Sequence, residues 1–319
     1  MNAGSVDALF VWNSNPCYDL PMADRFKSGM EKVALKVSFN SLLDETTSLC
    51  NYIAPDHHFL ESWGDVEPKR GHYSLMQPAI NPIFNTRQAA HSLLVWASSS
   101  NLSTTSEQPY YDFVKSTWQT QIFPKSGFST FQSFWDKCLH DGVFELKTSS
   151  SIAPNFAGNA VVAIGMVSNP SSNPLEISFV ENVGVGAGQY ANNPWLQELA
   201  DPITRCSWGN YVAVPVSFDG DRNFVTFNDF KENGELADLT FGSSVLTVGV
   251  IKQFGQMSGT LSIPLGYGRK SAGVCGTGVG TDVFPYLQTD SKGYFQYYNV
   301  DVNLGKSKGD IEQNFACVQ

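Results

Sequence analysis

The 319-residue sequence lacks several patterns that would assign a function directly. None of its six cysteines forms a CxxC pair, so the usual spacing of iron–sulfur and structural zinc sites is absent. It has no GxGxxG or GxxxxGK loop, which argues against a generic nucleotide-binding α/β protein. No apolar run reaches the length of a membrane span, so we expect no direct membrane span in these residues.

Positive charge is also scarce. Lys and Arg number 20 against 30 Asp and Glu, and the formal net charge is −10. Such a surface cannot neutralise a phosphate backbone, so we expect no nucleic-acid partner. The even number of cysteines leaves disulfides open, but reduced, buried thiols are the simpler interpretation for a chain of this size. The cysteines therefore do not identify the compartment.

The first third of the chain has the order strand, turn, helix, strand. Apolar runs predict strands over Val6–Trp12 and Val33–Phe39, and helical spacing predicts a helix over Met22–Lys32. This order is typical of a parallel, right-handed crossover unit. Because the chain begins almost at a strand, we expect it to be a piece of a longer polypeptide.

The stretch from Asn40 to Pro78 follows the second strand and opens on an acidic turn. Asp44 and Thr46 lie just past the strand's carboxyl end, where open α/β sheets bind ligands. Either residue could equally be the N-cap of a short helix through Cys50. Local sequence favours the cap, and the ligand site stays open.

Two further features of the first half invite a functional interpretation. Asp56, His57 and His58 suggest a metal site, but adjacent residues point to opposite faces and no third ligand is spaced nearby. Helices are predicted over 88–98, 109–121 and 129–139, and the last two are rich in aromatic residues. These aromatic residues, which include Phe113, Trp118, Phe131 and Trp135, favour a core or a partner surface over a cofactor box. No catalytic residue and no metal ligand is assigned, because no nucleophile–base or acid–base arrangement has a recognisable spacing.

The composition changes after about Leu146. A Ser-rich boundary at 147–154 precedes apolar runs read as strands, beginning with VVAIGMV at 161–167 and continuing to GTLSIPLGYG. Many strands with Gly-rich corners favour a closed barrel. We therefore predict an α/β domain over 1–146, an all-β domain over 155–303 and a polar tail over 304–319.

Four long segments resemble the C-terminal half of molybdopterin oxidoreductase large subunits, the dimethyl-sulfoxide-reductase superfamily. Within that superfamily, the sequence of these segments most resembles the iron–sulfur, molybdopterin-like subunit of bacterial alternative complex III, a quinol-oxidising respiratory assembly. The segments are NSNPCYDLP, DETTSLCNYIAPDHHFLESWGD, NNPWLQELADPITRCSWGNYVAVP and SGTLSIPLGYGRKSAG.

The resemblance implies a Rossmann-like α/β domain followed by a double-psi β-barrel domain. It also implies molybdopterin guanine dinucleotide as the family's cofactor and iron–sulfur clusters elsewhere in the parent polypeptide. The implied partners are those iron–sulfur domains and the other subunits of a membrane-bound respiratory complex, in the periplasm.

Family contacts to the dinucleotide carry over only in part. The Asn-Pro turn after the first strand matches Asn15-Pro16, the Thr of the acidic turn matches Thr46, and the family's Glu before a Gly matches Glu61 before Gly64. The candidate, vestigial dinucleotide positions are Asn13, Asn15, Asn40, Asp44, Thr46, Glu61 and Gly64.

Three departures suggest that this copy has lost the dinucleotide. Asn40 stands where cofactor-binding members use an Asp to read guanine, and an amide cannot match the guanine N–H pair with two acceptors. Asp65 and Glu67 follow Gly64 and would repel a pyrophosphate. SWGNY at 207–211 replaces the family's barrel motif.

Two functions are consistent with these residues. The first is a cofactor-free scaffold in a respiratory quinol-oxidising complex, with no cofactor in this piece. The second is half of a genuine molybdenum bis(guanine dinucleotide) reductase of the polysulfide or thiosulfate type, in which the pterin would supply the redox chemistry.

Overall fold

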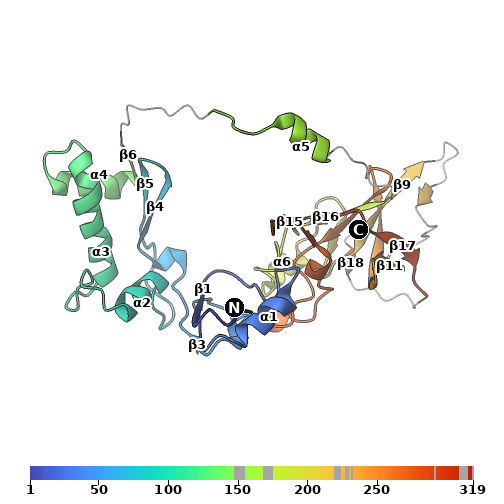
Figure 1. Ribbon diagram of the computed structural model, residues 1–319, viewed down its shortest axis with the longest axis horizontal. Coiled ribbons are helices and arrows are strands. Elements are labelled where there is room, and N and C mark those ends of the chain that lie inside the picture. Colours follow the sequence, from blue (N-terminus) through green and yellow to red (C-terminus); the bar gives the residue numbers. More distant parts are fainter. Residues whose placement is uncertain are drawn as a thin grey trace. The chain divides into compact units, whose positions relative to one another are not determined.

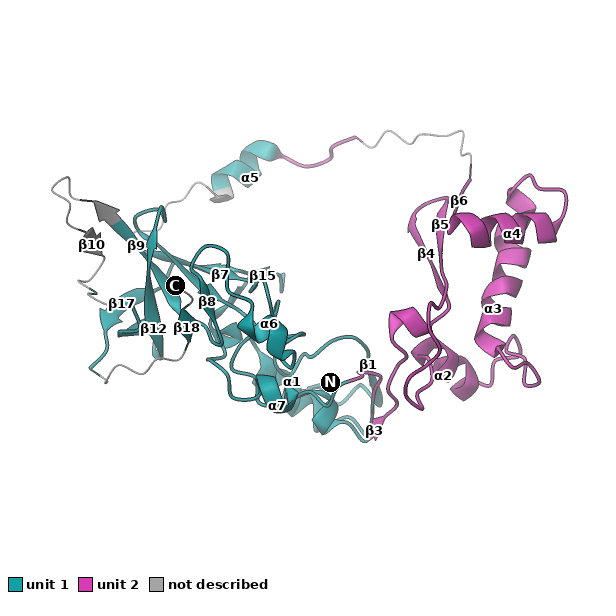
Figure 2. Cartoon of the chain, turned by 180° about the vertical axis from the view of Figure 1, so that it is seen from behind, with its two compact units in different colours: residues 1–37, 42–51, 160–319 teal, residues 38–41, 52–159 magenta. Residues whose placement is uncertain are grey.

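The computed structural model describes residues 1–146, 155–167, 175–218, 224–226, 230, 233–290, 292–308 and 315–317. The chain divides into two compact units, which are coloured separately in Figure 2. Unit 1 contains residues 1–37, 42–51 and 160–319, and unit 2 contains residues 38–41 and 52–159. Unit 1 thus brings the start of the chain together with its C-terminal half, and the sequence-based division into 1–146 and 155–303 stays a prediction.

The predicted strand, helix and strand at the start of the chain are confirmed. They are β1 (Ala8–Val11), α1 (Ala23–Met30) and β2 (Leu35–Ser38), and β1 and β2 are neighbours in one sheet. Strand β1 and helix α1 are labelled in Figure 1. Helix α1 turns Met30 into the interior, where its sulfur lies 3.5 Å from that of Cys17. The acidic turn that follows β2 ends in the 3-10 helix η1 (Thr47–Leu49). These elements carry the first group of candidate site residues.

An eight-stranded mixed sheet forms the main body of unit 1. Its strand order is β16-β7-β13-β9-β12-β11-β17, with β10 paired to β9. The pairs β12·β9 and β13·β7 are parallel, and the other ladders are antiparallel. The strands are β7 (Glu176–Val180), β9 (Val212–Phe218), β10 (Phe224–Thr226), β11 (Leu236–Phe241), β12 (Ser244–Phe254), β13 (Thr260–Pro264), β16 (Tyr298–Asn299) and β17 (Asn303–Lys306).

Alternating side chains of these strands build the core of unit 1. Along β7, Ile177 and Phe179 are buried while their neighbours are exposed. They pack with Val250, Ile263 and other apolar residues, and Tyr18 from the start of the chain joins the same cluster. This core therefore includes a residue from the N-terminal segment. Short elements complete the unit: α6 (Pro194–Glu198), β8 (Cys206–Ser207), α7 (Gly273–Gly276), η6 (Phe284–Tyr286), β14 (Gln288–Thr289), β15 (Phe295–Gln296) and β18 (Ala316–Cys317).

One predicted strand is wrong. The run VVAIGMV forms the helix α5 (Ala160–Val167), and Val161, Val162 and Ile164 are exposed on it. A short, continuous apolar run has no period that separates a strand from a helix, and its β-branched residues favoured the wrong choice. The Ser-rich boundary before α5 lies outside the described residues.

The predicted tail contributes ordered strands. Its first residues belong to β17, which pairs with β11, and β18 pairs antiparallel with β8. Phe315, next to β18, is buried against Tyr211 and Ile251. The described part of the tail is therefore integrated into unit 1.

Unit 2 combines a three-stranded antiparallel sheet with aromatic helices. The sheet order is β4 (Gly64–Lys69), β5 (His72–Met76) and β6 (Val143–Glu145). The predicted helices are confirmed as α2 (Ala89–Trp96), α3 (Pro109–Thr117) and α4 (Phe131–Asp141). Shorter elements are β3 (Tyr52–Ile53), η2 (Phe59–Glu61), the π-helical turn η3 (Trp118–Ile122) and η4 (Phe123–Lys125).

The aromatic residues of α3, η3 and α4 form the core of unit 2, as predicted. Trp118 and Trp135 are fully buried, and Phe113 and Phe131 pack against them as half-buried residues. The mixed α/β class is thereby confirmed, while the Rossmann-like and double-psi arrangement stays a prediction. None of the described helices is long and apolar enough to span a membrane.

Candidate functional site

Two of the predicted positions, Asn15 and Thr46, meet in unit 1. The Thr46 backbone N–H and its hydroxyl donate to Asn15 Oδ1, at 3.1 and 2.7 Å. The Thr46 hydroxyl oxygen accepts the Cys17 backbone N–H at 3.0 Å. Thr46 is fully buried, and its hydroxyl already serves as both donor and acceptor. These contacts fasten the Asn-Pro turn after β1 to the acidic turn after β2.

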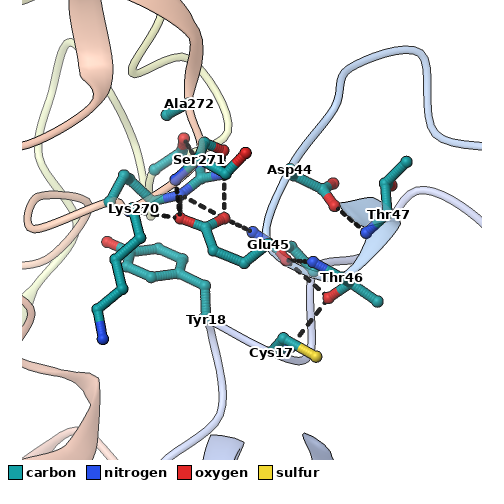
Figure 3. Close-up of polar contacts among 12 residues, drawn as sticks. Cys17, Tyr18, Asp44, Glu45, Thr46, Thr47, Lys270, Ser271 and Ala272 are labelled. Carbon is teal, nitrogen blue, oxygen red and sulfur yellow. Dashed lines mark hydrogen bonds and ion pairs between the residues drawn. The ribbon is translucent and has the colours of Figure 1, made fainter. Parts of the chain in front are cut away.

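Asp44 makes a capping-type contact, although the N-cap position of η1 is Thr46. The Asp44 Oδ1 accepts the backbone N–H of Thr47 at 2.7 Å, at the start of η1 (Figure 3). Thr46 makes no such cap. Asn13 is exposed and adopts φ +50° in the turn after β1, a conformation that Asn tolerates better than most residues. Its position agrees with turn chemistry.

The centre of the site is Glu45, which the sequence did not single out. Figure 3 shows its carboxylate facing the backbone of Lys270 and Ser271. Their N–H groups donate to Oε1 at 2.7 and 2.9 Å, and the amide of Asn15 donates to Oε2 at 2.8 Å. Arg269 adds its Nε and Nη2 donors at 3.0 and 2.7 Å. Five N–H donors thus converge on a single carboxylate, an arrangement we call the Glu45 nest.

Arg269 is held as firmly as Glu45. The exposed fractions of the two side chains are 7% and 9%. The Arg269 Nη1 donates to the Gly188 carbonyl at 2.6 Å, and its guanidinium carbon lies 4.6 Å from the Tyr18 ring centroid. The Tyr18 hydroxyl donates to the Tyr267 carbonyl at 2.7 Å. The pair is therefore buried with its hydrogen-bonding groups engaged, which is the condition for a favourable buried ion pair.

The loop that presents Arg269 requires a glycine before it. Gly268 has φ +70°, and a Cβ atom there would lie 1.9 Å from the Asp282 backbone nitrogen. Any side chain would push the loop away from Asp282. The tight loop after β13 then directs successive N–H groups of Lys270 and Ser271 at Glu45, as in backbone anion nests.

The electrostatics of the nest favour an ionised carboxylate. Burial by itself would raise the pKa of Glu45, but hydrogen bonds from Arg269, Ser271 and Asn15 outweigh it and lower the pKa to about 2. Burial raises the pKa of nearby Asp282 to about 6, against a backbone hydrogen bond from Phe284. Glu45 is therefore a fixed negative charge at any physiological pH.

The depressed pKa predicts a loss of stability in acid. Folding stabilises the charged form of Glu45, so its contribution is complete above the ordinary pKa of 4.5 and disappears as the pH falls through about 2. The difference corresponds to about 3 kcal/mol. Urea unfolding measures the free energy of unfolding at pH 6 and at pH 2. Between these pH values, the wild type should lose about 3 kcal/mol more of this free energy than Glu45→Gln does. Asp24→Asn, at an exposed carboxylate, is the control and should follow the wild type; a Glu45→Gln profile parallel to the wild type would contradict the prediction.

The remaining candidates belong to unit 2 and have structural roles there. Asn40 is buried, and its backbone N–H donates to Ser38 Oγ at 3.2 Å. Glu61 accepts the backbone N–H groups of His58 and Ile83, both at 2.9 Å, and these bonds lower its pKa. Gly64 is buried in β4, where an added Cβ would lie 2.9 Å from the terminal methyl of Met76.

The acids and histidines of unit 2 also serve the fold. Asp65 accepts the indole N–H of Trp118 at 2.8 Å, and Glu67 accepts the Gly71 N–H at 2.7 Å in the turn of the hairpin. His57 pairs with Thr86, and His58 caps η2. Within the described residues, no group of three His, Cys, Asp or Glu side chains could hold a metal ion.

These contacts do not fit a bound pterin dinucleotide. In the Glu45 nest, the Lys270 and Ser271 backbone N–H groups and the Arg269 guanidinium already donate to Glu45. The Asn15 amide nitrogen also donates to Glu45, and its oxygen accepts from Thr46. A phosphate would have to displace a carboxylate with five donors. The two key residues, Glu45 and Arg269, are 224 positions apart, so no spacing rule could have found them. The signal available in the sequence was the Gly-rich run GYGRKSAG, which contains Arg269, Lys270 and Ser271.

The comparisons with known proteins were made for sequence and fold. No protein-family model matches the chain. A segment of 91 residues, 27% of this chain, is 38% identical to the menaquinone reductase, molybdopterin-binding-like subunit of Nitratidesulfovibrio vulgaris, and covers 13% of that protein.

The fold is similar to that of acetylene hydratase from Pelobacter acetylenicus. The TM-score is 0.58 at 13% sequence identity, over 94% of this chain and 44% of that one. The chain spans less than half the length of both of these proteins. The sequence match is thus to a molybdopterin-binding-like subunit over a short segment, and the structural match shows a similar mixed α/β fold.

Proposed function

We propose that this chain is part of a molybdopterin-oxidoreductase-like subunit of a quinone-linked respiratory complex, and that it acts there as a cofactor-free scaffold. The relative whose sequence it matches is named as a subunit of a menaquinone reductase, described as molybdopterin-binding-like. The sequence resemblance to the corresponding subunit of alternative complex III points to the same class of assembly. We keep that complex as the specific form of the proposal.

The observation that carries the proposal is the Glu45 nest. A pair of successive backbone N–H groups with an arginine beside them is a site for an anion such as a phosphate. Here the anion is supplied by the chain, and Glu45 lies 2.7 Å from both the Lys270 nitrogen and the Arg269 Nη2. Such a carboxylate competes with any phosphate for the same donors and repels it.

The acidic hairpin in unit 2 supports the same reading. Asp65 and Glu67 follow Gly64, where the family resemblance would place part of a dinucleotide site, and both have structural hydrogen bonds. Their charges are therefore tied to the packing of the unit and would oppose a pyrophosphate. Replacing a ligand by internal contacts preserves a fold after its cofactor has gone.

The partners follow from the proposal. A scaffold of this kind would support iron–sulfur domains elsewhere in the parent polypeptide and contact the other subunits of the membrane-bound complex. Electrons would pass through centres outside this piece. On the family resemblance, we propose that such an assembly lies in the periplasm.

The proposal is tested by the cofactor content of the complete parent polypeptide. We expect the purified protein to release no fluorescent pterin on acid oxidation and to contain far less than one molybdenum per chain, while its iron is retained. A genuine molybdenum bis(guanine dinucleotide) reductase would instead give pterin and molybdenum in stoichiometric amounts, and that result would overturn the scaffold role. A molybdenum reductase of known content, purified in the same way, is the positive control.

A further inference from the structure

Two cysteines far apart in the sequence meet at the end of the described chain. Strand β18 pairs antiparallel with β8, and Cys317 lies directly opposite Cys206 in the register. Their sulfur atoms are 3.2 Å apart, although 111 positions separate the residues. Both are thiols in this structure.

The backbone geometry suits a covalent bond between them. Residues directly opposite in an antiparallel pair have Cα atoms about 4.5 or about 5.5 Å apart, depending on the hydrogen-bonding pattern. Both distances fall within the range of about 4.4–6.8 Å found for disulfides. The S–S bond is about 2.05 Å long, so the two sulfurs have to approach by roughly 1 Å.

The strand that carries Cys317 is anchored by its neighbour Phe315. This ring is buried against Tyr211, with a centroid distance of 5.4 Å and an edge-on angle of 62°. Gly249 of β12 makes room for it, since a Cβ there would lie 2.7 Å from a ring carbon of Phe315. The approach of the two sulfurs is thus a consequence of packing on the main sheet.

We propose that Cys206 and Cys317 form a disulfide that fastens β18 to β8. Exposed Cys317 attacks a small-molecule or protein disulfide, and one sulfur of that oxidant leaves as a thiol. Cys206 then attacks the Cys317 sulfur, and the second sulfur of the oxidant leaves. Two protein thiols are oxidised by two electrons, and the oxidant's disulfide becomes two thiols that carry the two protons.

The order of attack follows from the surroundings of the two thiols. Cys206 is buried, and burial raises its pKa, so it is a poor first nucleophile. Cys317 is exposed and accessible to an oxidant. Once the mixed disulfide has formed on Cys317, the opposite sulfur is already in contact. This inference is independent of whether the chain holds a cofactor.

The pairing can be tested on the complete polypeptide, equilibrated with mixtures of reduced and oxidised glutathione and then alkylated. Mass spectrometry without reduction should find the peptides of Cys206 and Cys317 linked, and the number of alkylated thiols should fall by two. Cys317→Ser should abolish the link. Cys275→Ser, at a half-buried cysteine outside the pair, is the matched control and should retain it.

Two further measurements test whether the link depends on the folded pairing of β18 with β8. Phe315→Ala should slow formation of the link at least about tenfold, because it removes the anchor of β18. Oxidation should raise the melting temperature of the wild type by roughly 5 °C or more, and should not raise that of Cys317→Ser. Alkylation of both cysteines in the folded wild type at every glutathione ratio, or a link from Cys206 to a different cysteine, would overturn the proposal.

Discussion

Replacing Arg269 by leucine is expected to destabilise unit 1 by about 3–5 kcal/mol, because it leaves the Glu45 charge buried without its partner. Three donors of the nest would remain, from Asn15, Lys270 and Ser271, but none carries a charge. The free energy of unfolding from urea titrations at pH 7 measures the effect.

Two variants separate this electrostatic effect from a packing defect. Arg25→Leu, on the exposed surface of α1, is the matched control and should change the free energy of unfolding by less than about 0.5 kcal/mol. The double variant Glu45→Leu with Arg269→Leu should recover part of the loss, because it removes the orphaned charge. If the double variant is less stable than Arg269→Leu by about another 3–5 kcal/mol, the orphaned charge of Glu45 is not the cause of the destabilisation.

Trp118→Ala is expected to destabilise unit 2 by about 3–5 kcal/mol, the range for removing a large aromatic residue from a core. Trp118 is fully buried, with ring centroids of Phe134 and Trp135 at 6.1 and 5.7 Å. It also donates its indole N–H to Asp65. Intrinsic tryptophan fluorescence during urea unfolding would detect the loss.

The same position offers a graded series. Trp118→Phe keeps most of the ring volume and loses the hydrogen bond, so its cost should fall well below that of alanine. Phe84→Ala, at a 75% exposed phenylalanine of unit 2, is the control and should be nearly neutral. Equal costs for Trp118→Ala and Phe84→Ala would show that the aromatic cluster is not the core of this unit.

The elements that could be predicted from the sequence are those with a clear period or end signal. Helix α4 has apolar residues at helical spacing, and Thr130 caps it by accepting the Ser133 N–H at 3.3 Å. Strand β7 alternates buried and exposed residues. Helix α5 offers neither signal, since it is apolar throughout and short, and the sequence therefore pointed to a strand.

The candidate site was predictable only as far as local turns. Asp44 and Thr46 stood out because they follow a strand, and Asn15 because of the family resemblance. The structure joins Asn15 to Thr46. Arg269, the residue that holds Glu45 beside them, belongs to the loop after β13 and lies 224 positions further along the chain than Glu45. A buried charge pair between distant segments leaves no local pattern, because each half looks like an ordinary surface residue. The pairing of Cys206 with Cys317 also leaves no local pattern, because the two cysteines are far apart in the sequence.

The account's central claim is that Glu45 replaces a ligand's anion. A density map of the intact parent complex, resolved well enough to show side chains, tests it most directly. We predict that the Glu45 carboxylate lies on Arg269 and the Lys270–Ser271 backbone, with no pterin dinucleotide on the chain. Density for a dinucleotide phosphate at those donors, with Glu45 turned away, would contradict the claim.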